Sequence, residues 1–221
     1  MILPTKVAYK LFTETHVFDE LTDKQSRILI AAIKIFAKKG YSNSSTKEIA
    51  EAAGVAEENI FNRFTNKYGL LQAVIKPVTR SIFPATFSQF TDAKLIVRDT
   101  DLHDFVKAVI EDRIKFMKDN ADVLKIFIAE MIYDDQLRTD FQAQFANSAI
   151  SYLKTIDQNL KIFKQKQALI DWENPEILRI MWSMVAGLVV SYLFFNQPVT
   201  TDKINHTVDA LTKALSKDRI D

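Results

Sequence analysis

The chain has 221 residues, of which 48% are hydrophobic and 16 are phenylalanine, which is enough for a substantial core and for more than one small domain. Its 29 Lys and Arg nearly balance its 28 Asp and Glu, so the net charge of +1 gives no global attraction to nucleic acid. The absence of cysteine excludes disulfides and thiolate metal sites, which fits a reducing cytoplasm. We expect a cytoplasmic protein without a signal peptide, because the first residues lack a basic segment followed by an apolar run.

Residues 1–21 are predicted to be an N-terminal extension. Val7, Leu11, Phe18 and Leu21 form one apolar side of a short helix. A minor-groove arm is the alternative, but such arms usually carry arginine, and the first arginine is Arg27. We therefore favour a segment that packs on the next domain or is disordered.

A helix is predicted from about residue 23 to residue 39. Thr22 and Gln25 are spaced for a capping box, and the pattern closes on Lys38, Lys39 and Gly40. The residues with helical spacing on its apolar side are Ile28, Leu29, Ala32, Ile33, Ile35 and Phe36.

Residues 45–67 are predicted to form two short helices joined by a tight turn. Ser45 and Glu48 fit a second capping box, Gly54 ends the first helix, and the second helix begins near Ala56. The side chains predicted to share one core are Ile49, Ala50, Ala53, Val55, Ile60 and Phe64. The second helix stays polar on its outer side, which fits a helix-turn-helix that reads the DNA major groove.

The basic residues of this region give only a weak positive bias. Residues 22–70 contain eight Lys and Arg against five acidic residues, a net charge of +3. Affinity for DNA would therefore depend on where individual charges are placed.

An ordered series of residues surrounds the helix-turn-helix: Arg27 to Phe36, Gly40-Tyr41, Ser44-Ser45, Ile49-Ala50, Ala53-Gly54-Val55, Ile60-Phe61, Phe64, Asn66-Lys67 and Leu70-Leu71. Over about residues 27–71 this series resembles the TetR family of transcriptional regulators. The resemblance implies an all-α dimer that binds a palindromic operator and releases it when a small molecule enters the C-terminal domain. It also implies a three-helix DNA-binding domain at residues 22–70 and a larger helical ligand-binding and dimerisation body at residues 71–221.

The resemblance places DNA contacts on both short helices. Lys67, beside Asn66, is expected to bind a DNA phosphate. Glu57 and Glu58, at the start of the second helix, can either accept a hydrogen bond from cytosine or interact favourably with the positive end of the helix dipole. Phe61 stands where the family commonly has tyrosine, so a hydroxyl donor to phosphate is missing. The expected DNA contacts are Ser45, Thr46, Lys47, Glu57, Glu58, Asn59, Phe61, Asn62, Arg63 and Lys67.

The rest of the chain is predicted to be helical. A helix that starts after Lys67 should kink or end at Pro77. A Phe-rich segment at 81–90 and a polar connection at 91–100 follow. Apolar faces then predict helices at 103–118, 121–133, 137 to about 167, about 175–195 and about 202–215.

The helix at about 175–195 is the most apolar of the chain. Asn174 is predicted to cap it with Pro175 at its first position, and Ile180 to Phe195 carry no charge. A stretch of this length is below the roughly 20 residues that span a bilayer, so we predict a helix buried on two sides and no membrane association. In the family the last two helices form the dimer interface, here predicted at Ile180, Met184, Gly187, Leu188, Ser191, Val208, Leu211 and Leu215.

Large adaptable side chains in the body suggest a cavity for an elongated, mostly apolar molecule. The candidate ligand-binding residues are Phe105, Phe116, Met117, Phe127, Met131, Tyr152, Trp182 and Met184. The alternative is a body that binds another protein and holds no small molecule. An enzyme is not expected, because His16, His103 and His206 lie far apart and no nucleophile or phosphate-binding motif occurs; no metal and no cofactor are expected either.

Overall fold

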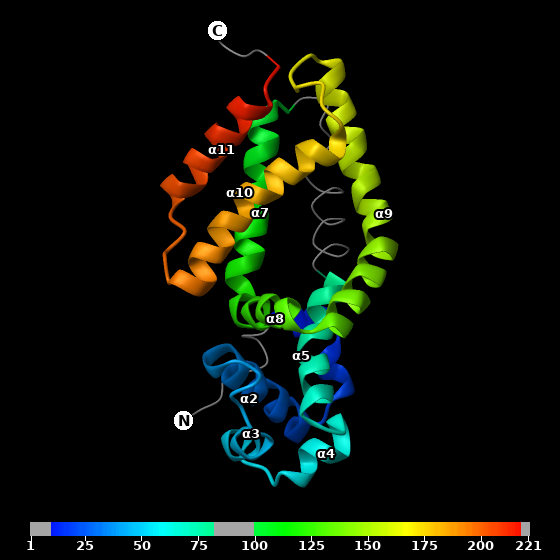
Figure 1. Cartoon of the computed structure of the whole chain (residues 1–221), viewed down its shortest axis with the longest axis vertical. Coiled ribbons are helices and arrows are strands. Elements are labelled where there is room, and N and C mark those ends of the chain that lie inside the picture. The colour runs from blue at the N-terminus through cyan, green and yellow to red at the C-terminus, as the bar shows by residue number, and fades with distance from the viewer. Residues whose placement is uncertain (1–9, 82–99, 218–221) are drawn as a thin grey trace. The chain divides into compact units, whose positions relative to one another are not determined.

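The computed structural model describes residues 10–81 and 100–217, with the side chains of residues 10, 79–81 and 144–155 outside that description (Figure 1). The described residues are helical apart from loops and one isolated bridge between Leu169 and Ser216. The predicted all-α fold is therefore confirmed. The segments predicted at 81–90 and 91–100 lie almost entirely outside the described residues.

The chain divides into two compact units. Unit 1 comprises residues 1–83 and 119–148, and unit 2 comprises residues 84–118 and 149–221. The chain therefore passes from one unit to the other three times. The long helix α9 (Asp135–Gln165) gives its first part to unit 1 and its second part to unit 2. A domain boundary between residues 70 and 71 stays a prediction.

Unit 1 contains the predicted helix-turn-helix. Its elements are α1 (Lys10–Glu14), the 3-10 turn η2 (Val17–Glu20), α2 (Asp23–Lys39), α3 (Thr46–Ala53), α4 (Glu58–Phe64), α5 (Lys67–Ser81), α8 (Ala121–Tyr133) and the start of α9. Helix α8 packs against α2 and α5. It comes from a distant part of the sequence, yet it belongs to the core beneath the helix-turn-helix.

Helix α2 has the predicted bounds because its ends are locally encoded. The Thr22 side chain accepts from the Gln25 N–H, and the Gln25 side chain accepts from the Thr22 N–H at 3.0 Å, so the capping box is confirmed. Its apolar residues are almost fully enclosed: Ile28, Leu29, Ala32 and Ile33 have no exposed surface.

The N-terminal extension packs on unit 1, which was one of the two outcomes expected for it. Leu11, Phe12 and Phe18 are buried, and the rings of Phe12 and Phe18 are 5.7 Å apart. Helix α1 contacts α5. The extension therefore adds apolar core to the unit.

Helix α5 continues through Pro77 to Ser81, so of the two predicted outcomes, a kink or an end at Pro77, the end is wrong. Proline removes one backbone hydrogen bond from the helix. Val74, Ile75 and Val78 are fully buried around it, and their burial offsets that loss.

Unit 2 consists of α7 (Leu102–Asp119), the second part of α9, α10 (Asn174–Phe195) and α11 (Thr201–Leu215). The last residue of α7, Asp119, is already counted in unit 1. The predicted bounds of α7, α9, α10 and α11 agree with the observed bounds to within two residues, and the predicted bounds of α8 agree at both ends. The predicted Asn174 cap is wrong: Glu173 occupies the N-cap position without a side-chain hydrogen bond, and the Asn174 amide donates to Asp157 instead.

Helix α10 is buried on one side only within the chain. Ile177, Met181, Val185 and Leu193 are enclosed, whereas Phe195 is 69% exposed. The predicted burial on two sides is therefore wrong for the single chain. Among the described residues, α10 is the one helix long and apolar enough to cross a membrane by length and composition. Core and interface helices meet the same criteria.

Candidate DNA interface, ligand cavity and dimer face

The turn between α3 and α4 has the geometry that its glycine requires. Gly54 has φ 65° and ψ 43°, a left-handed conformation that costs glycine little. Ser45 caps α3 by accepting from the Glu48 N–H at 3.1 Å. The reciprocal half of that predicted capping box is absent, because the Glu48 carboxylate accepts from Lys39 Nζ at 2.5 Å. Glu48 thus ties α3 to the end of α2.

Helix α4 begins at Glu58, two residues later than predicted, because Ala56 and Glu57 form the preceding turn. The Ala56 carbonyl accepts from the backbone and side-chain N–H groups of Asn59, at 3.1 and 3.0 Å. The Glu57 carboxylate accepts from Thr46 Oγ1 at 2.5 Å and makes no cap hydrogen bond. Thr46 and Glu57 therefore link α3 to the turn before α4, and Asn59 closes that turn, so all three are less available to DNA than the sequence suggested.

Six of the other seven predicted DNA contacts point outward, and Lys67 is half-buried. Ser45, Lys47, Glu58, Phe61, Asn62 and Arg63 are all exposed. Ile49, Ala50, Ala53, Ile60 and Phe64 are buried on the opposite side, as predicted, and Val55 is half-buried. A polar outer face over a closed apolar base is the arrangement of a reading helix pair.

The junction between α4 and α5 depends on Gly69, which sequence reasoning missed. The Gly69 N–H donates to Asn66 Oδ1 at 2.8 Å, so Asn66 caps α5. A Cβ atom at Gly69 would lie 2.0 Å from the Phe64 carbonyl oxygen. The run of Asn66-Lys67-Tyr68-Gly69 directly after a short helix was the available signal, because an N-cap followed by glycine in the first turn indicates close backbone approach.

Lys67 lies within a cluster of five residues, here called the Lys67 cluster: Tyr41, Lys67, Tyr68, Glu130 and Asp134. The Lys67 ammonium group is 4.4 Å from the centre of the Tyr41 ring. Burial lowers the pKa of Lys67, and the negative charge of Glu130 opposes that shift. Burial, together with the negative charge of Asp134, raises the pKa of Tyr68.

Glu130 lies on α8, which packs against α2 and α5. Burial and the nearby charge of Asp134 raise the pKa of the Glu130 carboxyl, while Lys67 and a hydrogen bond from the Tyr41 backbone lower it. Glu130 and Asp134 were not predicted as site residues. They lie one helical turn apart at the end of α8, and nothing in the local sequence indicates that this turn meets residues 41, 67 and 68.

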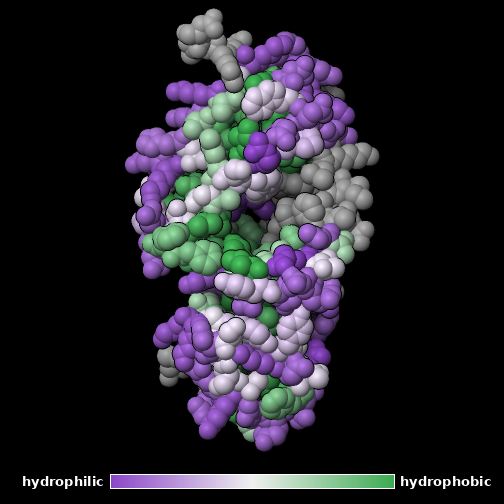
Figure 2. Space-filling model, viewed as in Figure 1, coloured by the Kyte–Doolittle hydropathy of each residue, from purple (hydrophilic) through white to green (hydrophobic). Residues whose placement is uncertain are grey.

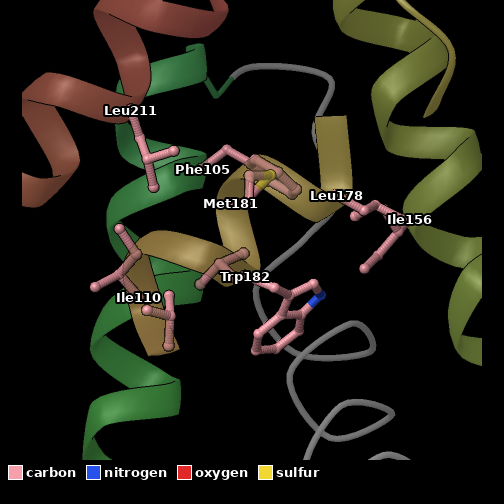
Figure 3. Close-up of a pocket in the computed structure, with 9 residues that line it drawn as sticks. Phe105, Ile110, Ile156, Leu178, Met181, Trp182 and Leu211 are labelled. Carbon is pink, nitrogen blue, oxygen red and sulfur yellow. The ribbon is translucent and has the colours of Figure 1, made fainter. Parts of the chain in front are cut away.

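Unit 2 contains an apolar cavity. It is lined by Phe105, Val109, Ile110, Ile156, Leu178, Met181, Trp182, Val185 and Leu211. In Figure 3, Phe105 from α7 lies against Met181 from α10, and Ile156 points from α9 toward α10. The cavity volume is about 10 Å³, space for roughly one water molecule. A larger ligand would have to move the lining side chains.

The predicted ligand-binding residues do not form one site. Phe105 and Trp182 line the cavity, and Met117 is buried in unit 2 outside it. Phe127 and Met131 belong to unit 1, where Phe127 packs on Phe141 with ring centres 5.2 Å apart. The remaining members divide as follows: Phe116 contacts the Arg113 guanidinium, Met184 lines a separate groove, and the side chain of Tyr152 lies outside the described residues.

That groove lies between α10 and α11 and has a volume of about 460 Å³. Its lining includes four of the predicted interface residues, Met184, Gly187, Leu188 and Ser191, together with residues of α11 such as His206 and Ala210. Figure 2 shows apolar side chains gathered over the C-terminal part of α10, where Val190, Phe194 and Phe195 are exposed.

Three residues were wrongly predicted to lie at the dimer interface. Val208, Leu211 and Leu215 are buried inside unit 2, so their side chains cannot reach a partner. The α11 residues that line the groove are Lys203, His206, Thr207 and Ala210. Ile180 is half-buried outside the groove lining.

One surface group of the described residues has metal-ligand atoms close together. Asp101, His103 and Asp104 lie within 4.8 Å of one another, and His103 Nε2 is 3.2 Å from Asp209. All three are at least partly exposed; His103 Nδ1 is 3.6 Å from Asp104, and Asp101 accepts from the Asp104 backbone N–H. We assign no metal site to this ordinary arrangement of surface charges.

Comparison with known proteins points to transcriptional regulators, both by a family model and by a relative. A family model described as bacterial regulatory proteins, tetR family, matches residues 28–74. Over 199 residues the chain is 27% identical to the uncharacterized HTH-type transcriptional regulator YvkB of Bacillus subtilis (strain 168), covering 87% of this chain and 97% of that relative.

Two solved structures illustrate the shared fold. A transcriptional regulator from Saccharomonospora viridis in complex with choline has a TM-score of 0.63 at 16% identity, covering 86% of this chain and 96% of that one. The fatty acid degradation regulator FadR from Bacillus halodurans has a TM-score of 0.57 at 18% identity, covering 87% and 94%. At these identities the structures support the fold and leave the ligand open.

Proposed function

Because this chain is a DNA-binding transcriptional regulator of the TetR family, we propose that it is a cytoplasmic repressor that binds a palindromic operator as a homodimer. A small apolar molecule that enters unit 2 would release the operator. The observation that carries the DNA-binding part is the outward polar face of α3 and α4 over a closed apolar base.

The DNA contacts are proposed by position and exposure. Lys47, Asn62 and Arg63 are exposed on the two short helices and carry the groups that read guanine, adenine or phosphate. Lys67 begins α5, three residues after the end of α4, and carries a positive charge that can bind phosphate. Dimerisation doubles these contacts, which a single short reading helix needs for useful specificity.

Lys67→Ala should weaken binding to every duplex and reduce the slope of log affinity against log salt by about one unit. The reason is that one phosphate contact releases about one condensed counterion. Fluorescence anisotropy with an operator and with a random duplex, over a series of salt concentrations, measures both quantities.

Asn62→Ala is the matched comparison, because it removes a neutral reading group. It should change base preference at one operator position and leave the salt slope as it was. An unchanged salt slope in Lys67→Ala would exclude Lys67 as a phosphate contact.

The groove between α10 and α11 supports dimerisation through these two helices. It is open within one chain, it contains Gly187, and exposed apolar residues lie beside it. A second copy that packs there would bury the face of α10 that the chain itself leaves exposed, as in a four-helix interface.

The apolar cavity supports an effector that binds in unit 2. Its lining comes from α7, α9, α10 and α11, so expansion of the cavity would have to move these helices or their side chains. One of the two similar structures holds choline, and the other is named as a regulator of fatty acid degradation. Choline and fatty acids differ in chemistry. We therefore propose only that the effector is largely apolar.

Dodecanol and dodecanoate should change the fluorescence of Trp182 and weaken operator binding in the same concentration range. Trp182 lines the cavity and the other tryptophan, Trp172, is exposed, so Trp172→Phe leaves one reporter at the site. A ligand lowers operator affinity only by its differential affinity for the two states, so both signals must be followed.

Trp182→Phe is the control that retains only the exposed tryptophan, and its fluorescence should not respond. A fluorescence change without any effect on operator affinity would show binding that is not regulatory. The small cavity volume favours one alternative, a body that binds another protein and no small molecule. The absence of any response to these probes would support it.

A further inference from the structure

Unit 2 encloses a side-chain amide whose donor group has no hydrogen-bond partner. Asn159 of α9 is 5% exposed, and among the described residues no atom accepts a hydrogen bond from its Nδ2 group. A buried amide usually finds a partner within the fold, because an unpaired donor away from water costs free energy. A buried donor without a partner is therefore a candidate for a group that binds a ligand.

Asn159 lies on the face of α9 that borders the apolar cavity. Ile156, about one helical turn before it, lines the cavity. Phe163, about one turn after it, packs on the cavity residue Phe105 with ring centres 5.2 Å apart. Residues three to four positions apart share one face of a helix. Asn159 is therefore flanked along α9 by a residue that lines the cavity and by a residue that packs on its wall.

Arg113 of α7 is the other buried polar side chain in the described part of unit 2. Its Nε atom donates to Asp112 at 2.9 Å, and its Nη2 atom donates to the same carboxylate. The guanidinium group also lies 5.4 Å from the centre of the Phe116 ring. This cation already has an anion of its own, and the residues that line the cavity carry no charge. An anionic ligand would thus meet no uncompensated positive charge there.

We propose that Asn159 is a ligand-binding residue that donates a hydrogen bond to an uncharged oxygen of the effector, such as a hydroxyl or a carbonyl oxygen. This inference rests on the proposed effector site in unit 2. The apolar part of the effector would occupy the enlarged cavity, and its oxygen would satisfy the Nδ2 group. An ionised carboxylate would lose its hydration there without gaining a counter-charge. The effector is then a neutral molecule with a polar group, such as a long-chain alcohol or ketone.

Three probes with the same chain length test the proposal: dodecanol, 1-chlorododecane and dodecanoate. Binding is followed by the fluorescence of Trp182 in the Trp172→Phe background. Dodecanol should bind about five- to twentyfold more tightly than 1-chlorododecane, which has the same apolar chain and no hydroxyl group. Dodecanoate, which is ionised at about pH 7.5, should bind more weakly than dodecanol. Asn159→Leu should abolish the preference for dodecanol over 1-chlorododecane, because only the alcohol loses a hydrogen bond.

Gln158→Leu is the matched control. It removes an exposed amide from the adjacent position of the same helix and should leave the preference unchanged. A steric effect of the leucine at position 159 would weaken both neutral probes and keep the ratio of their affinities. The ratio therefore separates a lost hydrogen bond from a change in packing. If Asn159→Leu does not fold, Asn159→Ala provides the same comparison with a smaller side chain.

Two results would overturn the proposal: equal affinity for dodecanol and 1-chlorododecane when Asn159 is present, or an unchanged preference in the Asn159 variants. Tighter binding of dodecanoate than of dodecanol would overturn the uncharged class and favour Arg113 as the anchor. If none of the probes changes the Trp182 fluorescence, the proposed effector site fails, and the role of Asn159 falls with it. If the probes bind without preference and still weaken operator binding, only the role of Asn159 fails.

Discussion

Gly69→Ala should lower operator affinity more than about 30-fold, although position 69 contributes no side chain to the DNA face. The added carbon would meet the Phe64 carbonyl oxygen at 2.0 Å and the carbonyl carbon at 3.1 Å. Backbone atoms cannot rotate out of the way as a flexible side chain can, so the last turn of α4 or the first turn of α5 must shift. Overpacking of this kind costs about 2 to 4 kcal/mol, and each 1.4 kcal/mol corresponds to about tenfold in affinity.

Two measurements together identify this mechanism. The unfolding temperature should fall by about 5 to 15 °C, as expected for that energy in a protein of this size. The operator titration should show the loss of affinity well below that temperature. Lys76→Ala, an exposed position on the same helix, should change stability by no more than about 0.5 kcal/mol. Wild-type behaviour of Gly69→Ala would mean that the approach of α4 to α5 is looser than the 2.0 Å contact indicates.

Gly187→Leu should raise the dissociation constant of the dimer by about 30-fold or more and leave the fold of the single chain intact. A Cβ atom at Gly187 meets no atom within 4 Å inside the chain. Leucine also favours a helix interior over glycine by about 0.8 kcal/mol, so the isolated subunit should not be destabilised. In a two-fold symmetric dimer each subunit inserts one new side chain, and each insertion into a packed contact costs about 1 to 3 kcal/mol.

Sedimentation velocity over a range of micromolar concentrations measures the dissociation constant, and an operator titration should show a parallel loss of DNA binding. Asn205→Leu is the matched control, because residue 205 is exposed on α11 but does not line the groove. A Gly187→Leu protein that stays dimeric would place the interface elsewhere on the chain.

Local signals explain how much of the fold was predictable. The capping box at Thr22, the left-handed Gly54 and the lysines before Gly40 are read from neighbouring residues, so α2 and α3 were predicted with their observed bounds. The same holds for the outward face of Lys47, Asn62 and Arg63, because helical spacing assigns it once the helices are known.

Signals of the same kind could not identify what each apolar stripe packs against. The stripe of Val208, Leu211 and Leu215 predicted a buried face correctly, but the face closes on unit 2 and not on a partner. Composition likewise grouped Phe105 and Phe127, which the fold places in different units. Glu130 and Asp134 come near Tyr41, Lys67 and Tyr68 only through the packing of α8 against α2 and α5, and no local pattern encodes that arrangement.

The order in which unit 1 is completed has a consequence for synthesis. On the ribosome α2 and α5 emerge long before α8, and the surface that α8 covers contains apolar side chains. The helix-turn-helix therefore cannot reach its full stability until translation has passed residue 133, with the whole of α7 made in between. Nascent chains that stall before that point expose an unfinished apolar face, which chaperones and proteases recognise.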